Sequence, residues 1–159
     1  MDESLYIMSV TPSDRVWMAQ QATEMWGAEF VVSRGVAHRV AELPGFIAWI
    51  GHERVGVATC HFGQTDCELV TLDALRPRIG VGTALVEAVR EAAAGRRLWL
   101  VTTNDNVDAI RFYQRRGFVL TAVHPNAVEQ SRKLKPQIPR IGNYGIPIRD
   151  ELVFEYAGA

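Results

Sequence analysis

The amino-acid sequence predicts a mixed α/β domain, with a largely antiparallel sheet and helices on both of its faces. Two observations lead to this fold class. The first half of the chain contains short apolar runs separated by residues typical of tight turns, and the second half alternates strand-like with helix-like patterns. Strand–helix–strand connections cross over in a right-handed sense and place helices against the sheet. The length of 159 residues, 48% of them hydrophobic, predicts one domain spanning 1–159.

The first half of the chain is predicted to form mostly strands. Its predicted elements are a strand at 5–10, a helix at 16–26, and strands at 46–50, 55–62 and 67–75. Thr11-Pro12 favours a helix start and Gly27 a helix end. The turn at 51–54 joins two of the strands into a hairpin. The segment 30–43 has a mixed pattern that predicts no single element. One side of the helix is expected to carry Val16, Ala19, Thr23 and Trp26.

The second half changes to helical periodicity after two glycines, Gly80 and Gly82. Asn104-Asp105-Asn106 is expected to cap a second helix, and Gly117 to end it. The predicted elements are a helix up to Ala92, a strand at 98–102, a helix up to Arg116, a strand at 118–123, a short helix at 126–134, a Pro/Gly loop at 136–147 and a strand at 152–156. The tryptophans expected in the core are Trp17, Trp26, Trp49 and Trp99.

Composition excludes several classes of protein. The 17 basic and 18 acidic residues give a formal charge of −1, which argues against a dedicated nucleic-acid-binding protein. No apolar run approaches the roughly 18 residues that cross a bilayer, and residues 1–4 lack the features of a secretory signal. The two cysteines, Cys60 and Cys67, predict neither a disulfide framework nor a zinc site, and the four histidines are scattered. We therefore expect a cytoplasmic protein with no metal and with no nucleic-acid or membrane partner.

The segment from the third strand into the following helix carries the most specific local signal. Gly80-Val81-Gly82-Thr83 lets the backbone turn tightly and leaves N–H groups unobstructed at a helix N-terminus, which suits a phosphate. A strand-to-helix turn that needs glycine for shape alone remains the alternative. A P-loop is discounted because Thr83-Ala84 stands where its Lys-Ser/Thr pair would be, and a dinucleotide fold is discounted because its third glycine is missing.

Two segments together resemble the GNAT acyl-CoA N-acyltransferases. Residues 68–74 with 80–85 look like motif A of that family, and residues 104–118, with Asn106, Phe112-Tyr113 and Gly117-Phe118, look like motif B. The resemblance covers about one third of the chain. Pro77 departs from the pattern, because it stands where the family carries Gln or Arg. Either neighbour, Arg76 or Arg78, is a candidate to meet a phosphate in its place.

The resemblance implies the GNAT fold, with a sheet splayed between the strands at 67–75 and 98–102, and acetyl-CoA as co-substrate. An acetyl group would pass directly to an amine acceptor, either a small molecule or a peptide. The pantetheine arm of the cofactor would lie in the splay. The residues implied to bind the cofactor are Leu72, Asp73, Ala74, Arg78, Ile79, Gly80, Val81, Gly82, Thr83, Asn106, Ala109 and Phe112.

Two side chains are expected to carry the chemistry. Tyr113 matches the family's general acid for the departing thiolate, and Glu68 matches an acid that serves as general base in part of the family. A water-relayed base is the alternative to Glu68, and weaker contenders are Asp73, His61 and Asp150. A structural interpretation exists for both, because an acid at a strand start is commonly solvated and a tyrosine on a helix is commonly a core aromatic.

The remaining expectations concern the acceptor and the alternative functions. The acceptor pocket is expected from 23–39 and 142–150. An acyl-CoA-binding sensor that has lost turnover is the main alternative to an enzyme. A second alternative is an interaction protein that uses the basic helix at 127–135. A homodimer through an exposed strand edge is also possible.

Overall fold

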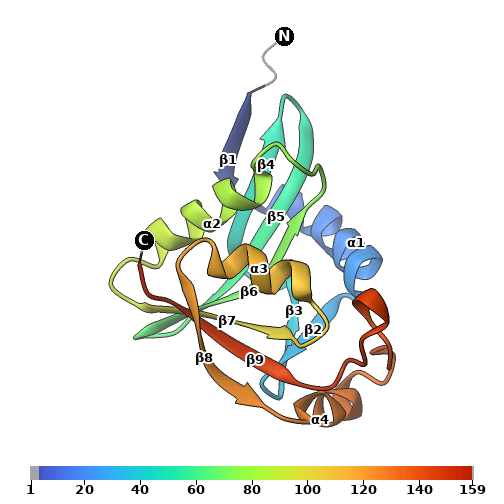
Figure 1. Ribbon diagram of the computed structural model, residues 1–159. Helices are drawn as coiled ribbons and strands as arrows, with labels where there is room; N and C mark the ends of the chain where they lie inside the picture. The colour runs from blue at the N-terminus through green and yellow to red at the C-terminus, as the bar shows by residue number, and fades with distance from the viewer. Residues whose placement is uncertain (1–3, 159) are drawn as a thin grey trace.

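The protein, in a computed structural model, is described over residues 4–158 (Figure 1). Most of the segment 1–4, on which the expectation about a secretory signal depends, and Ala159 lie outside the described residues. The strands are β1 (Leu5–Ser9), β2 (Phe30–Ser33), β3 (Val36–Arg39), β4 (Gly45–Ile50), β5 (Glu53–Phe62), β6 (Asp66–Ala74), β7 (Arg97–Thr103), β8 (Phe118–His124) and β9 (Glu151–Tyr156). The α-helices are α1 (Arg15–Trp26), α2 (Val81–Ala92), α3 (Val107–Gln114) and α4 (Ala127–Leu134).

Seven strands form one sheet in the order β1-β4-β5-β6-β7-β9-β8, and β2 with β3 forms a separate hairpin. Within residues 4–158, β6 and β7 pair in parallel and the other neighbouring strands pair antiparallel. The predicted mixed, largely antiparallel sheet is therefore confirmed. None of the helices in this part of the chain is long and apolar enough to span a bilayer.

The sheet opens between its two parallel strands. Pairing of β6 with β7 covers Asp66–Leu69 against Arg97–Leu100 and ends there, although β6 continues to Ala74 and β7 to Thr103. Figure 1 shows β4, β5 and β6 running away from the fan of β7, β8 and β9. The expected splay is confirmed, and it leaves one edge of β6 without a strand partner over its last residues.

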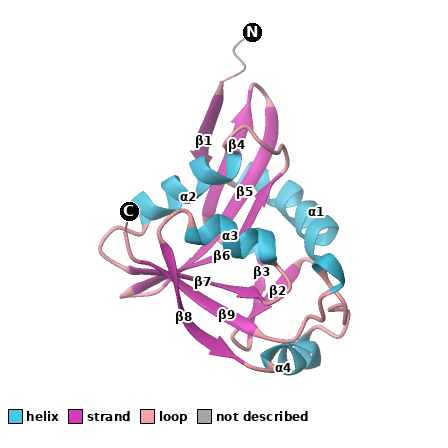
Figure 2. Ribbon diagram, viewed as in Figure 1, coloured by secondary structure: helices cyan, strands magenta, loops and turns pink. Residues whose placement is uncertain are grey.

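Helices cover both faces of the sheet, as predicted (Figure 2). Leu85 and Val89 of α2 are fully buried in the main core, which also contains Ala48 of β4. Met18 of α1 is fully buried against Ile47, the residue before Ala48. Since successive strand residues point to opposite faces, α2 and α1 lie on opposite sides. Each such apolar side chain contributes roughly 1.5–3 kcal/mol on burial.

The buried side of α1 differs from the prediction. Met18 and Ala22 are buried, whereas Val16 is 72% exposed and Trp26 is 38% exposed. Apolar residues occur all around this helix, so its periodicity alone does not select a face. The neighbouring sheet selects it, because Met18 has Ile47 and Val57 to pack against.

The prediction that the tryptophans lie in the core is only partly correct: none is fully buried, although Trp17 and Trp49 pack against the smaller core cluster. Trp17 and Trp49 are half-buried and flank the Arg54 guanidinium, whose Cζ lies 5.5 Å and 4.7 Å from their ring centroids. Trp26 and Trp99 each donate the indole N–H to a carboxylate. A ring with a polar N–H is most stable where one side is apolar and the other meets a polar partner.

The segment 30–43, for which no element was predicted, forms the β2–β3 hairpin. The C-terminal Pro/Gly loop is fastened beside the start of α3. The Asn104 side-chain oxygen accepts from the N–H groups of Arg149 and Asp150, and Asp105 accepts from the backbone N–H of Asn143 at 3.0 Å. These bonds fix the loop to the residues that follow the end of β7.

Candidate functional site

The loop between β6 and α2 contains two left-handed backbone conformations. Arg78 has a φ of 68° and Gly80 a φ of 83°, and α2 begins at Val81. A side chain at Gly80 would meet nothing within 4 Å, so the backbone angle is what favours glycine there. Residues 76–80, including the predicted Ile79, are exposed. The exposed turn therefore leads directly into the N-terminus of α2, and the N–H groups and positive dipole end of a helix N-terminus suit an anion.

The second glycine has a different physical reason. A Cβ on Gly82 would lie 3.0 Å from Cζ of Phe112, so glycine lets α2 approach α3 closely. Arg116 lies with its Cζ 3.6 Å from the centroid of the Phe112 ring and donates to Thr83 Oγ1 from Nε at 3.0 Å and from Nη2 at 2.8 Å. Arg116 is a residue of the site that sequence reasoning missed. Its spacing of four residues from Phe112, one helical turn, was the available signal.

A groove of about 580 Å³ lies between α2, the end of α3 and the end of β9. It contains three guanidinium groups and an aromatic ring. Its lining residues are Thr83, Val86, Glu87, Arg90, Gln114, Arg115, Arg116, Gly117, Tyr156 and Gly158. The groove is thus open, has more basic than acidic side chains, and begins at Thr83 in the first turn of α2.

The two arginines that flank Pro77 are in different situations. Arg76 forms an ion pair with the carboxylate of Glu53. Arg78 is exposed and makes no ion pair among the residues that the structure describes. Arg78 is accordingly the one whose guanidinium is free to meet a phosphate at this turn.

A bulge in β6 changes the face of the sheet to which each of its last residues points. Thr59 pairs with Thr71 and Cys60 pairs with Leu69, so Val70 is an extra residue in β6. Before the bulge Leu69 lies in the core beneath α2, and after it Leu72 does. Leu72, Asp73 and Ala74 still pair with β5, but they lie beyond the last pair with β7 and so border the splay.

As a consequence of the bulge, Glu68, Thr71 and Asp73 share the other face of the strand. Glu68 contacts the β2–β3 hairpin and Asp73 contacts the end of α1. Without the extra residue Asp73 would point into the apolar core on the α2 side. The bulge therefore places two carboxyl groups from one strand on the same side of the sheet.

The capping role predicted for Asn106 is confirmed. Its side-chain oxygen accepts from the N–H of Ala109 at 3.4 Å, one turn into α3. Ala109 is half-buried and packs against the main core, as does Phe112. Both therefore lie on the side of α3 that faces the sheet and α2.

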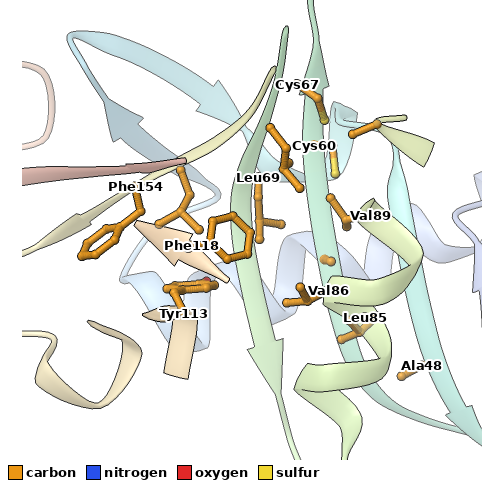
Figure 3. Close-up of a cluster of buried hydrophobic side chains, with 14 of the residues drawn as sticks. Ala48, Cys60, Cys67, Leu69, Leu85, Val86, Val89, Tyr113, Phe118 and Phe154 are labelled. Carbon is orange, nitrogen blue, oxygen red and sulfur yellow. The ribbon is translucent and has the colours of Figure 1, made fainter. Parts of the chain in front are cut away.

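Tyr113 lies on the same side of α3, in the main core. Its ring packs edge-on against Phe112, with centroids 5.4 Å apart. It also packs edge-on against Phe118, with centroids 5.5 Å apart (Figure 3). Its hydroxyl has no hydrogen-bond partner among the described residues. Burial and the negative charge of Asp73 raise the pKa of Tyr113, so the phenol is protonated at neutral pH. Tyr113 thus supplies an O–H donor that no other side chain of residues 4–158 uses, on a ring that is otherwise buried.

Glu68 is not a solvated acid at a strand start. It is 5% exposed, its Oε2 accepts from Ser33 Oγ at 2.6 Å, and its Oε1 lies 3.7 Å from Nε2 of His38. Burial raises the pKa of Glu68, while the Ser33 hydrogen bond and the charge of His61 oppose that increase. A carboxylate with a raised pKa is a stronger base than an ordinary glutamate.

Of the weaker contenders, Asp73 is buried and Asp150 is engaged. Asp73 accepts from Nε1 of Trp26 at 3.3 Å, and burial raises the pKa of Asp73 to about 6. Asp150 accepts from the backbone N–H of Asn126 at 2.9 Å, which makes it a support for the start of α4. Asp73 therefore borders the splay with a pKa close to neutral pH, whereas the Asp150 side chain is engaged at the start of α4.

The hairpin brings in residues that sequence reasoning missed. Ser33 and His38 contact Glu68, and Arg34 at the hairpin turn donates to Glu151 at 2.7 Å. Ser33 and Glu68 are 35 residues apart in sequence, and Arg34 and Glu151 are 117 residues apart, so no local pattern could pair them. No group of three or more side chains in residues 4–158 is arranged to hold a metal ion.

The sheet is mixed and splits between its two parallel strands, and a glycine turn and a buried tyrosine lie beside the split. This is the architecture of an acyl-CoA-dependent acyltransferase. The chain belongs to the GNAT acetyltransferase family, because residues 13–118 match the family model described as "Acetyltransferase (GNAT) family". Membership in this family supports acetyl transfer as the general activity.

Individual relatives agree with this assignment. The chain is 46% identical over 134 residues to the uncharacterized protein YdhI of Bacillus subtilis (strain 168), covering 81% of this chain and 83% of YdhI. Arabidopsis thaliana Naa50, in complex with the bisubstrate analogue CoA-Ac-MVNAL, shares the fold at a TM-score of 0.71 and 19% identity, over 98% of this chain and 99% of that one. A GNAT family acetyltransferase from Elizabethkingia anophelis with acetyl-CoA bound shares the fold at a TM-score of 0.68 and 17% identity, over 95% of this chain and 96% of that one.

Proposed function

We propose that the protein transfers the acetyl group of acetyl-CoA directly to an amine, with Glu68 as general base and Tyr113 as general acid. The observation that carries the proposal is the pair of buried titratable groups on opposite sides of the splayed sheet. Tyr113 lies in the core on the α2 side, and Glu68 lies beneath the hairpin on the other side. An amine and a thioester that meet in the splay would therefore have a base on one side and an acid on the other.

The cofactor would be held by the glycine turn and the two strands that diverge. Its diphosphate would meet the N–H groups at 80–83 and the Arg78 guanidinium, and its nucleotide end would lie in the groove beside Arg90, Arg115 and Arg116. The pantetheine arm would replace the missing β7 partner along Leu72, Asp73 and Ala74 and pass the start of α3 at Asn106. The acetyl-CoA bound by the Elizabethkingia anophelis relative supports this choice of co-substrate.

The acceptor amine must lose a proton to react. An alkylammonium with a pKa near 10.4 costs about 4 kcal/mol to deprotonate at pH 7. Glu68 lowers this cost by taking the proton as the nitrogen attacks, directly or through a water. The negative charge that develops on the thioester oxygen would meet backbone N–H groups on the unpaired edge of β6, and one such donor contributes roughly 3–4 kcal/mol to lowering the barrier.

Tyr113 would serve the departing thiolate. A thiol has a pKa near 8.5, and the pKa of Tyr113 is raised above that of a free phenol, so complete proton transfer is uphill. The phenol therefore acts mainly as a hydrogen-bond donor that stabilises the sulfur as its bond to carbon breaks. A contribution of about 10²-fold is expected from such a group.

The acceptor would approach from the face that carries the end of α1, the hairpin and the 142–150 loop. Buried carboxyl groups there, at Glu68 and Asp73, favour an amine that arrives with a positive charge. The peptide portion of the analogue bound by Naa50 supports including peptide α-amines among the candidates. The acceptor is thus proposed to be a small or peptide amine.

The test is to titrate the protein with acetyl-CoA and then to follow free thiol with a panel of polyamines, amino acids and short peptides. Saturable binding of acetyl-CoA, together with release of the CoA thiol in the presence of at least one amine, supports the proposal. Binding of acetyl-CoA without thiol release in the presence of any amine would instead identify an acyl-CoA sensor. Absence of binding at millimolar acetyl-CoA would overturn both.

A further inference from the structure

A cluster of polar side chains is buried beneath the β2–β3 hairpin and connects Glu68 with the surface. We infer that His38 and His61 carry the proton that Glu68 removes from the acceptor amine out to solvent. The inference rests on the proposed role of Glu68 as general base. It adds two positioning and proton-transfer residues to the site, and neither of them touches the reacting atoms.

A buried base needs an exit for its proton. Glu68 is 5% exposed and one of its oxygens is held by Ser33, so bulk water has little direct access to the carboxyl group. After each turnover the carboxylate must be regenerated before another ammonium can be deprotonated. The oxygen that Ser33 does not hold, Oε1, is the one that faces His38.

His38 is placed to accept from Glu68. It lies on β3 and is 8% exposed, and its Nε2 is 3.7 Å from Oε1. A side-chain movement of less than 1 Å would make this a hydrogen bond, and catalytic contacts are often that much longer before substrate binds. Burial and the charge of His61 lower the pKa of His38, which keeps a lone pair on the imidazole at neutral pH.

His61 continues the path to the surface. It is the cross-strand partner of Glu68 in the β5–β6 ladder, its ring centroid is 5.5 Å from that of His38, and it is exposed. Three titratable groups therefore follow one another from a buried strand to solvent. The neighbours whose charges also act on Glu68 are Asp66 of β6 and Glu151 of β9, and the latter is paired with Arg34.

The proposed transfers move protons only. An N–H bond of the ammonium breaks as an O–H bond forms at Glu68 Oε1. That O–H bond then breaks as an N–H bond forms at Nε2 of His38, which enters with its proton on Nδ1. The resulting imidazolium releases its Nδ1 proton to His61 or to water, and the final acceptor is solvent or buffer. Proton exchange with solvent then returns the neutral imidazole to its Nδ1-protonated form before the next cycle. Glu68 is again a carboxylate, and every electron pair remains on its own atom.

The kinetic test compares His38→Gln and His61→Gln with a matched control, His52→Gln, in the exposed turn between β4 and β5. Glutamine keeps a polar side chain but does not titrate near neutral pH. With the best amine of the panel, we expect kcat of His38→Gln to fall about tenfold with KM for acetyl-CoA unchanged. Added imidazole should restore much of the rate, and His52→Gln should behave as the unsubstituted protein.

A purely structural cluster predicts a different result. A His38→Gln protein that loses activity without rescue by imidazole, or that keeps full activity in dilute buffer, would overturn the relay. If none of the amines in the panel causes the unsubstituted protein to release thiol from acetyl-CoA, the proposed function fails and the relay fails with it. If the unsubstituted protein is active but imidazole does not restore the rate of His38→Gln, the relay is overturned and the proposed function stands.

A second measurement does not depend on turnover. Carbon-13 and proton NMR titrations would follow the Glu68 carboxyl and the His38 imidazole in the free protein. His61→Gln should raise the pKa of both groups, because the charge of His61 lowers each of them. Unchanged titration of both groups in that variant would show that the three side chains are not coupled and would overturn the inference.

Discussion

The two carboxyl groups that β6 places on one face have different neighbours. Glu68 keeps a serine hydroxyl and a histidine ring beside it, whereas Asp73 has an indole N–H and the Tyr113 phenol nearby. Desolvation raises the pKa of both, so each holds a proton more tightly than an exposed acid would. These environments favour Glu68 over Asp73 for the proposed role of base, because the second oxygen of Glu68 is not held by Ser33.

Removal of either proposed catalytic group should affect turnover more than cofactor binding. We expect Glu68→Gln to lower kcat by about 10²–10³-fold, and Tyr113→Phe by about 10²-fold, because each removes one proton-transfer or hydrogen-bond step. Acetyl-CoA affinity, measured by calorimetry, should change less than threefold. A parallel loss of affinity and rate in Tyr113→Phe would show that the ring is structural.

The raised pKa of Asp73 predicts a stability effect with a defined sign. Its pKa is 3.8 in an unfolded chain and about 6 here, so folding favours the protonated acid. The folded state is therefore penalised as pH rises through this interval, by up to about 3 kcal/mol above it. Asp73→Asn should raise the free energy of unfolding at pH 7.5 and have little effect near pH 3.5. Urea denaturation at the two pH values measures this, and equal effects at both would contradict it.

At the scale of elements, the junction of β6, α2 and α3 organises the cofactor side. The turn positions N–H groups, and the close approach of Gly82 to Phe112 fixes where α3 holds Tyr113. Arg116 then joins the two helices through Thr83. The glycine turn proposed to hold the diphosphate and the proposed acid are therefore parts of one packed unit.

A side chain at position 82 should separate these two helices. We expect Gly82→Val to weaken acetyl-CoA binding at least tenfold, because its Cβ would lie 3.0 Å from Phe112 and push α2 from α3. Combining it with Phe112→Leu should recover part of the affinity by providing space. Calorimetric titration of the single and double variants measures this, and failure of the second substitution to help would point to the loop rather than the contact.

At the scale of the whole molecule, the C-terminal segment closes the acceptor face. Lys135, at the end of α4, is buried, and its Nζ donates to the carbonyl oxygens of Trp26 and Phe30 at 2.7 and 2.9 Å. Arg132 is likewise used internally and donates to carbonyls of Ile138 and Ile148. Two of the cations on the basic helix at 127–135, the candidate interaction surface in the sequence, therefore hold the chain together instead of facing solvent.

Removal of the Lys135 ammonium should loosen this closure. Lys135→Met leaves two carbonyl groups unsatisfied, so we expect the free energy of unfolding to fall by about 1–3 kcal/mol. Lys133→Met, an exposed neighbour on the same helix, is the control and should be nearly neutral. Thermal and urea denaturation of both variants checks the difference. Equal stability of the two would show that the buried contacts contribute nothing net.

The local features were predictable from the sequence. The glycine turn, the Asn106 cap and the position of Tyr113 on α3 depend on residues a few positions apart, and helix geometry relates such residues directly. Strand and helix identities followed for the same reason, as did the fold class. The family resemblance rested on these same segments.

The surroundings of Glu68 were decided by the tertiary structure. The sequence by itself determined the fold class, the turn that can hold a phosphate and the tyrosine beside the splay. Only the folded chain brought Ser33 and His38 to Glu68, turned Asp73 to the same face through the Val70 bulge, and buried Met18 instead of Val16. Contacts between segments tens of residues apart depend on how elements pack and pair, and local periodicity carries no information about that register.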